Sequence, residues 1–128
     1  MDELVRWLGE QLDEDERIAR DADPGPWKSD SLGRHDQAAI KLGSPTSTSL
    51  IQFDGSRAAA NGQHVARHDP ARVLREIEAK RDLLRLAERA HDYHETFTSG
   101  FASALEGTLR LFALAYADRP GYREEWAP

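Results

Sequence analysis

The sequence of 128 residues contains no cysteine. Disulfide bonds, thiolate nucleophiles, zinc ribbons and iron–sulfur clusters all require cysteine side chains, so this chain cannot form any of them. A zinc site would have to use histidine and carboxylate ligands alone.

Long apolar segments are also missing. Apolar residues make up 39% of the chain, which suffices for one modest core, but no run approaches the roughly 20 apolar residues that span a bilayer. The N-terminal segment 1–17 carries charges where a secretory signal needs an apolar stretch. The sequence therefore predicts a cytoplasmic protein without a membrane segment, folded as a single domain over 1–128.

Basic residues are fewer than acidic ones, 17 against 23, which gives a formal net charge of −6. The average field of such a chain repels phosphate backbones, so nucleic acid is not an expected partner. A local basic face would need Arg67, Arg72, Arg75 and Arg81 without interruption, but Glu76, Glu78 and Asp82 stand among them. The GxSxG, GxxxxGK[ST] and GxGxxG motifs are absent too, so the sequence supports no enzyme class and no cofactor.

The remaining pattern predicts an α+β fold. The first helix spans 1–22, where an apolar stripe runs through Leu4, Val5, Leu8, Leu12, Ile18 and Ala19. The 23-DPGPW-27 segment then ends the helix, because proline fixes φ and donates no hydrogen bond. Alternating and β-branched residues predict a small antiparallel sheet over 27–54, with two strands joined by a turn at 43–47 and a third near Trp27.

Two longer helices are predicted to follow the sheet. A loop with a turn at 61-NG-62 and a short helix at 62–67 leads to Asp69-Pro70, a strong helix start, and the helix then covers 70–92. The last helix covers 99–117, and the tail 118–128 is expected to fold back on the body. The apolar stripe of the last helix is wide, which is compatible with burial in the core or with a homodimer.

Histidines supply the candidate metal site. His64 and His68 are four residues apart and Asp69 is adjacent, which is a spacing used by two-histidine sites. A structural interpretation competes with it: hydrogen-bonded histidines beside an N-cap aspartate. His91 and His94, at the end of the 70–92 helix, are explained by the helix dipole.

Three aromatic residues are candidates for an interaction surface. Trp27 follows two prolines that make its backbone rigid, and Tyr122 and Trp126 lie in the acidic tail. Each of them also suits packing in the core, which is the commoner use of such rings.

Four ordered motifs resemble an uncharacterised family of small proteins from Streptomyces-type actinobacteria and their phages. They are the LDEDExIAR-like end of the first helix, A-x-PGPW at 22–27, HxARHDPARVL from residue 64 and YADxPxYREEW at 116–126. The resemblance implies no activity, because that family has no known function. A looser likeness to small phage-encoded accessory proteins implies a phage or prophage setting.

These observations predict a non-enzymatic binding or interaction protein with an unknown protein partner. The acidic face of the first helix would suit a basic partner surface. The alternative is a His/carboxylate metal-binding protein with hydrolytic activity, centred on His64, His68 and Asp69.

Overall fold

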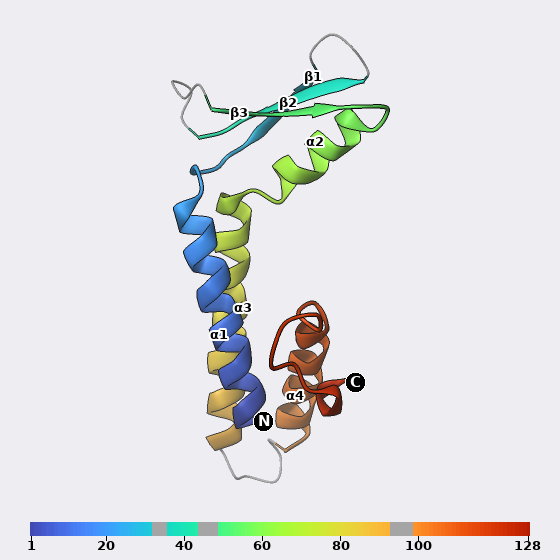
Figure 1. Ribbon diagram of the computed structural model, residues 1–128. Coiled ribbons are helices and arrows are strands. Elements are labelled where there is room, and N and C mark those ends of the chain that lie inside the picture. Colours follow the sequence, from blue (N-terminus) through green and yellow to red (C-terminus); the bar gives the residue numbers. More distant parts are fainter. Residues whose placement is uncertain (32–35, 44–48, 93–98) are drawn as a thin grey trace. The chain divides into compact units, whose positions relative to one another are not determined.

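The structure is a computed structural model that describes residues 1–31, 36–43, 49–92 and 99–128. Its helices and antiparallel three-stranded sheet confirm the α+β class (Figure 1). In chain order the elements are α1 Asp2–Asp21, β1 Lys28–Ser31, β2 Gln37–Lys41, β3 Leu50–Asp54, α2 Ala58–Arg67, α3 Pro70–Asp92, α4 Ser99–Leu114 and a 3₁₀ turn at Glu124–Trp126. Within the described part of the chain, no helix is both long and apolar enough to cross a membrane.

The chain forms two compact units. Unit 1 contains Met1–Glu14 and Ile77–Pro128, and unit 2 contains Asp15–Glu76. The predicted single domain stays a prediction. Charge is divided unequally between the units, because unit 2 has nine acidic and nine basic residues. The whole formal net charge of −6 therefore belongs to unit 1.

In unit 2 the sheet has the order β1-β2-β3 and α2 covers one of its faces (Figure 1). The register pairs Ser29 with Ile40 and Ala38 with Phe53, so alternate residues of the three strands share the covered face. Gly62 of α2 lies on this face, since an added Cβ would stand 2.8 Å from Ser29 Oγ and 3.4 Å from Ala38 Cβ. A larger side chain at residue 62 would have to displace the Ser29 hydroxyl, so glycine favours the close approach of helix and sheet.

This packing explains why the prediction of a turn at 61-NG-62 is wrong. The two residues lie inside α2, which starts at Ala58 rather than near residue 62. Asn-Gly favours turns in isolation, but packing against the sheet overrides a local preference of about 1 kcal/mol. Elsewhere the predicted boundaries agree closely: α3 covers 70–92 as expected, whereas α4 ends at Leu114 rather than 117. The predicted turn at 43–47 falls mostly on 44–48, outside the described residues.

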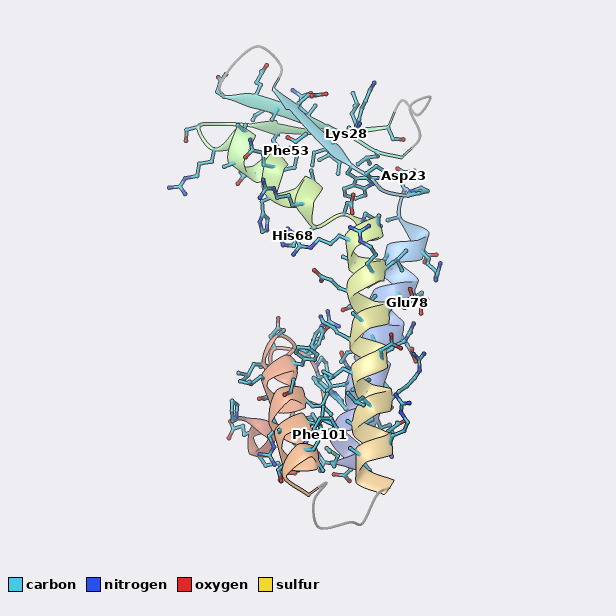
Figure 2. The ribbon with its side chains drawn as sticks, turned by 180° about the vertical axis from the view of Figure 1, so that it is seen from behind. Asp23, Lys28, Phe53, His68, Glu78 and Phe101 are labelled. Atoms are coloured by element: carbon cyan, nitrogen blue, oxygen red, sulfur yellow. The ribbon has the colours of Figure 1, made fainter. Side chains whose placement is uncertain are left out.

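Unit 1 buries the apolar faces of three helices against one another. Its helical core consists of Leu4, Leu8 and Leu12 of α1, Ile77, Leu84 and Ala87 of α3, and Leu105, Leu109 and Ala113 of α4. Polar contacts support this packing, since Lys80 Nζ of α3 donates to Tyr116 Oη just after α4 at 2.9 Å, and Arg81 of α3 forms an ion pair with Asp13 of α1. Figure 2 shows the side chains of this unit, with Phe101 labelled on α4.

Two stripes are less buried than the sequence predicts. Most of the α1 stripe is buried, but Ile18 is 53% exposed. On α4 the stripe is wider than the core that it covers, and Phe101, Leu111 and Leu114 remain exposed. The tail packs as expected, with Trp126 buried and its ring centroid 5.3 Å from that of Trp7.

Candidate functional site

The Pro-Gly-Pro-Trp turn of unit 2 is held by one buried carboxylate. Asp69, only 6% exposed, accepts a hydrogen bond from the backbone N–H of Trp27 at 2.8 Å through Oδ2. Its other oxygen, Oδ1, accepts from the backbone N–H of Arg72 at 2.9 Å. Asp69 is therefore the N-cap of α3, as predicted, and Pro70 occupies the first helical position, where its missing N–H costs nothing. The same carboxylate fixes the turn 42 residues earlier in the chain.

Gly25 makes this contact sterically feasible. A Cβ at that position would lie 2.6 Å from Ala71 Cβ and 2.8 Å from Asp69 Oδ2. Both distances are shorter than real carbon contacts, so a side chain at residue 25 would push the turn away from the start of α3. Glycine between the two prolines is thus a packing requirement of this corner.

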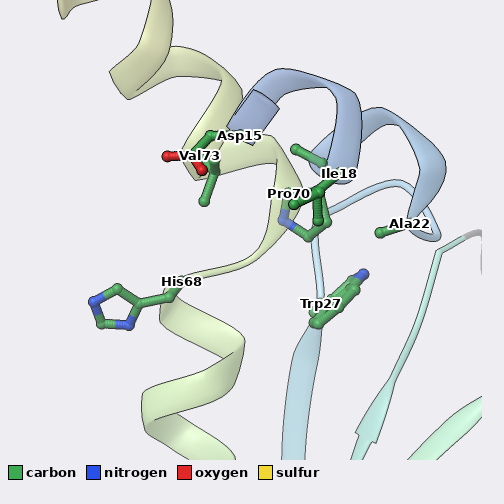
Figure 3. Close-up of a pocket in the computed structure, with 8 residues that line it drawn as sticks. Asp15, Ile18, Ala22, Trp27, His68, Pro70 and Val73 are labelled. Carbon is green, nitrogen blue, oxygen red and sulfur yellow. The ribbon is translucent and has the colours of Figure 1, made fainter. Parts of the chain in front are cut away.

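An open groove lies beside the turn and has a volume of about 320 Å³ (Figure 3). Its lining comes from the end of α1, the turn and the start of α3, and most of it is apolar. The lining residues are Asp15, Ile18, Ala19, Ala22, Trp27, His68, Pro70 and Val73. The exposed Ile18 belongs to this lining, which accounts for an apolar side chain outside the core.

Rigid supports surround the indole of Trp27. Its Nε1–H donates to the carbonyl oxygen of Asp23 at 3.0 Å, and its backbone N–H is held by Asp69. Pro70, which is buried, stands on the α3 side of the groove. The groove is therefore formed in advance by fixed groups, which lowers the entropy cost of binding a guest.

Ionisable groups are confined to two residues of the lining, Asp15 and His68. Figure 3 shows the His68 ring directed away from Trp27 and the carboxylate of Asp15 near Val73. The lining is therefore apolar apart from one carboxylate and one imidazole. It offers no pairing of a nucleophile with a base.

The proposed metal ligands are close together, and the side chains of His68 and Asp69 make structural hydrogen bonds. The rings of His64 and His68 have centroids 4.4 Å apart, and His68 Nδ1 lies 2.7 Å from the carbonyl oxygen of His64. Because a carbonyl only accepts, this Nδ1 carries the proton, which leaves Nε2 as the nitrogen able to bind a metal. Both oxygens of Asp69 already accept backbone hydrogen bonds.

A third ligand is not found nearby. Among the residues that the structure describes, no three His, Asp or Glu side chains are grouped so that they could hold a metal ion. The side chain of His91 and the whole of His94 lie outside the described residues.

Tyr122 and Trp126 form an aromatic cluster in unit 1 with Trp7 and Tyr116. Tyr122 and Trp126 meet edge to face at 5.9 Å and 83°, and each ring also contacts Trp7. The Trp7 Nε1–H donates to the carbonyl oxygen of Pro120 at 3.1 Å. Trp126 is thus part of the core of this unit, whereas Trp27 lines the mostly apolar groove of unit 2.

The two tyrosine hydroxyls of this cluster differ in their partners. Tyr116 Oη accepts the hydrogen bond from Lys80, whereas Tyr122 Oη is buried and has no hydrogen-bond partner among the described residues.

Comparison with known proteins identifies the family of the chain. The model of a family of unknown function, DUF6221, matches residues 1–128. The chain belongs to this family. No curated protein and no solved structure matches it.

Sequence reasoning identified Trp27 and Asp69 but missed the groove that Trp27 lines. The sequence pattern placed Ile18 on the apolar stripe of the first helix, and it did not indicate Ala22 or Val73 as site residues. A signal was present in α1, because Asp15, Ile18 and Ala22 recur at helical spacing and place a carboxylate within an apolar strip. The place of Pro70 in the lining depends on contact between the end of α1 and the start of α3, which are far apart in sequence. The periodicity of apolar residues does not predict such a contact.

Replacement of Asp69 tests whether its carboxylate holds the turn and caps α3. We expect Asp69→Ala to lower the free energy of unfolding by about 1–3 kcal/mol, because it removes a helix cap and takes the hydrogen-bond acceptor from the partly buried N–H of Trp27. Urea denaturation measures this loss. Asp21→Ala is the control, since its exposed ion pair with Arg17 contributes roughly 0.5 kcal/mol or less. Equal losses in the two variants would contradict the role of Asp69.

The tyrosine pair gives a matched test of the aromatic cluster. Tyr122→Phe removes a buried hydroxyl that has no described partner, so we expect it to leave stability unchanged or raise it by about 1 kcal/mol. Tyr116→Phe removes the acceptor of Lys80 and should cost about 0.5–1.5 kcal/mol. Thermal unfolding of both variants checks the sign. A larger loss for Tyr122→Phe than for Tyr116→Phe would show that the Tyr122 hydroxyl has a partner.

Proposed function

We propose that this protein is a non-enzymatic binding protein whose Trp27 groove holds an apolar side chain of a protein partner. One observation carries the proposal: Ile18, Trp27 and neighbouring apolar groups form an open groove on supports fixed by Asp69. Interfaces concentrate their binding energy where an apolar anchor enters a rigid pocket. The groove has the composition of such a pocket.

The volume of the groove limits the size of the group that it can bind. A volume of about 320 Å³ is at the lower end of the range for small-molecule pockets, roughly 300–1,000 Å³. Such pockets also place several polar groups to fix the ligand, whereas this lining is apolar apart from Asp15 and His68. A single leucine, phenylalanine or tryptophan side chain therefore suits the groove better than a polar metabolite does.

Charge favours a basic segment on the partner. Asp15 lines the groove, and the part of α1 and the turn that belong to unit 2 contain four acidic residues against two arginines. The acidic residues are Asp15, Glu16, Asp21 and Asp23, and the arginines are Arg17 and Arg20. A lysine or arginine next to the apolar anchor would be attracted to this surface, which speeds association and excludes acidic competitors.

The metal-binding alternative has weaker support. It relies on His64 and His68 as two neighbouring nitrogen ligands, but structural zinc sites use four ligands and catalytic ones three. Asp69 is occupied as a cap, so we assign the histidines to the α2–α3 corner and propose no hydrolytic role. The cytoplasmic location and the actinobacterial or phage setting implied by the motifs remain part of this proposal.

An array of immobilised hexapeptides tests the groove. We expect binding to peptides with a central Leu, Phe or Trp flanked by Lys or Arg, and much weaker binding when the centre is Gly or the flanks are Glu. Ile18→Asn should weaken that binding by at least about tenfold, because it places an amide where the anchor packs. Ile18 is exposed, so the variant should fold normally.

Leu50→Asn is the matched control. Leu50 is 59% exposed, lies in the same unit on β3 and does not line the groove. The proposal fails if peptide binding does not depend on the central residue, or if Ile18→Asn and Leu50→Asn weaken that binding equally.

A further inference from the structure

The outward side of α4 is apolar and carries no charge. Phe101, Leu111 and Leu114 are 52%, 58% and 44% exposed. The only ionisable residues of this helix are Glu106 and Arg110, which pair with each other at 3.2 Å. In a chain with 31% charged residues, and in the unit that holds the entire net charge of −6, such a face is exceptional.

The α4 outer face is one continuous strip. At 3.6 residues per turn its members lie within an arc of about 140°, on the side away from the buried Leu109. They are Phe101, Ala104, Gly107, Thr108, Leu111 and Leu114. Large side chains occupy the ends of the strip and small ones its centre.

No contact within the described part of the chain explains the small residues at the centre. A Cβ on Gly107 would meet no atom within 4 Å, so the fold does not need glycine there. Glycine inside a helix reduces helix stability, and close approach by another backbone is a standard reason for accepting that loss. The Thr108 hydroxyl donates to the carbonyl oxygen of Ala104 at 2.8 Å, so covering it would leave no donor without a partner.

The strip is complementary to itself. An antiparallel pairing of two α4 helices about a two-fold axis matches residues that are equally far from the midpoint between Gly107 and Thr108. Leu111 then meets Ala104 of the partner subunit, so that large packs against small, and Phe101 meets Leu114 of the partner subunit. The backbones approach most closely at Gly107, where there is no side chain.

We propose that the α4 outer face binds a second copy of this chain. A charged partner surface would form no ion pair here, because the face has no charge. A second copy offers the same uncharged and sterically matched surface. The contact is limited to one helix about 24 Å long, which lies at the low end of interface size, below about 1,200 Å². The dimer therefore exchanges with monomer, and its surface lies in a different unit from the groove.

Salt gives this dimer a distinct signature. Each copy brings a net charge of −6, and added salt screens the repulsion between the copies. Self-association through an uncharged face therefore strengthens as salt rises. Binding of a basic peptide in the groove weakens under the same change.

Sedimentation equilibrium over about 1 µM to 1 mM protein tests the proposal in two variants. Leu111→Gln removes the main apolar contact, and Gly107→Glu places two like charges next to the axis. We expect each variant to raise the dissociation constant of the dimer at least about tenfold, and the wild-type constant to fall between about 0.05 and 0.5 M NaCl.

Two controls match these variants. Leu50→Gln alters an equally exposed leucine in unit 2, and Gly9→Glu makes the same change at another helical glycine with no atom within 4 Å of its Cβ position. Both should dimerise like the wild type. A monomer throughout the range, or equal weakening by a variant and its control, would overturn the proposal. Dimerisation in an Ile18→Asn chain would persist, which separates this result from the test of the groove.

Discussion

A single buried carboxylate organises unit 2. Asp69 joins the backbone N–H of Trp27 to that of Arg72, and so connects the turn after α1 to the start of α3. The absence of a side chain at Gly25 leaves the space in which this contact forms. The position of Trp27 relative to Pro70, and with it the shape of the groove, depends on these two hydrogen bonds.

Apolar side chains outside the cores indicate what the two units do. Ile18 is an exposed aliphatic residue beside an indole that is fixed on both its ring and its backbone, which is the arrangement expected of a binding groove. Leu111 is an exposed aliphatic residue on a charge-free helix face, and no contact among the described residues requires the glycine of that face. Trp126, by contrast, packs against Trp7 within its own unit.

Helix and strand assignments could largely be read from the sequence because local signals were strong. Asp69-Pro70 is a combined cap and helix start, and both 23-DPGPW-27 and the alternation near Ile40 are unambiguous. The turn predicted at 61-NG-62 failed because helix–sheet contact at Gly62 outweighs local propensity. The groove could not be predicted, since it requires Ile18 and Pro70, far apart in sequence, to lie side by side.

The resonances of the three tryptophan indole N–H groups provide the most direct test that the groove binds a basic apolar segment. Nitrogen–proton correlation spectra would be recorded while a capped Lys-Leu-Lys peptide is added, with a capped Lys-Gly-Lys peptide as the reference. We predict that the Trp27 resonance shifts with the leucine peptide alone, while Trp7 and Trp126 of unit 1 do not respond. No shift of Trp27, or equal shifts of all three indoles with both peptides, would contradict this account.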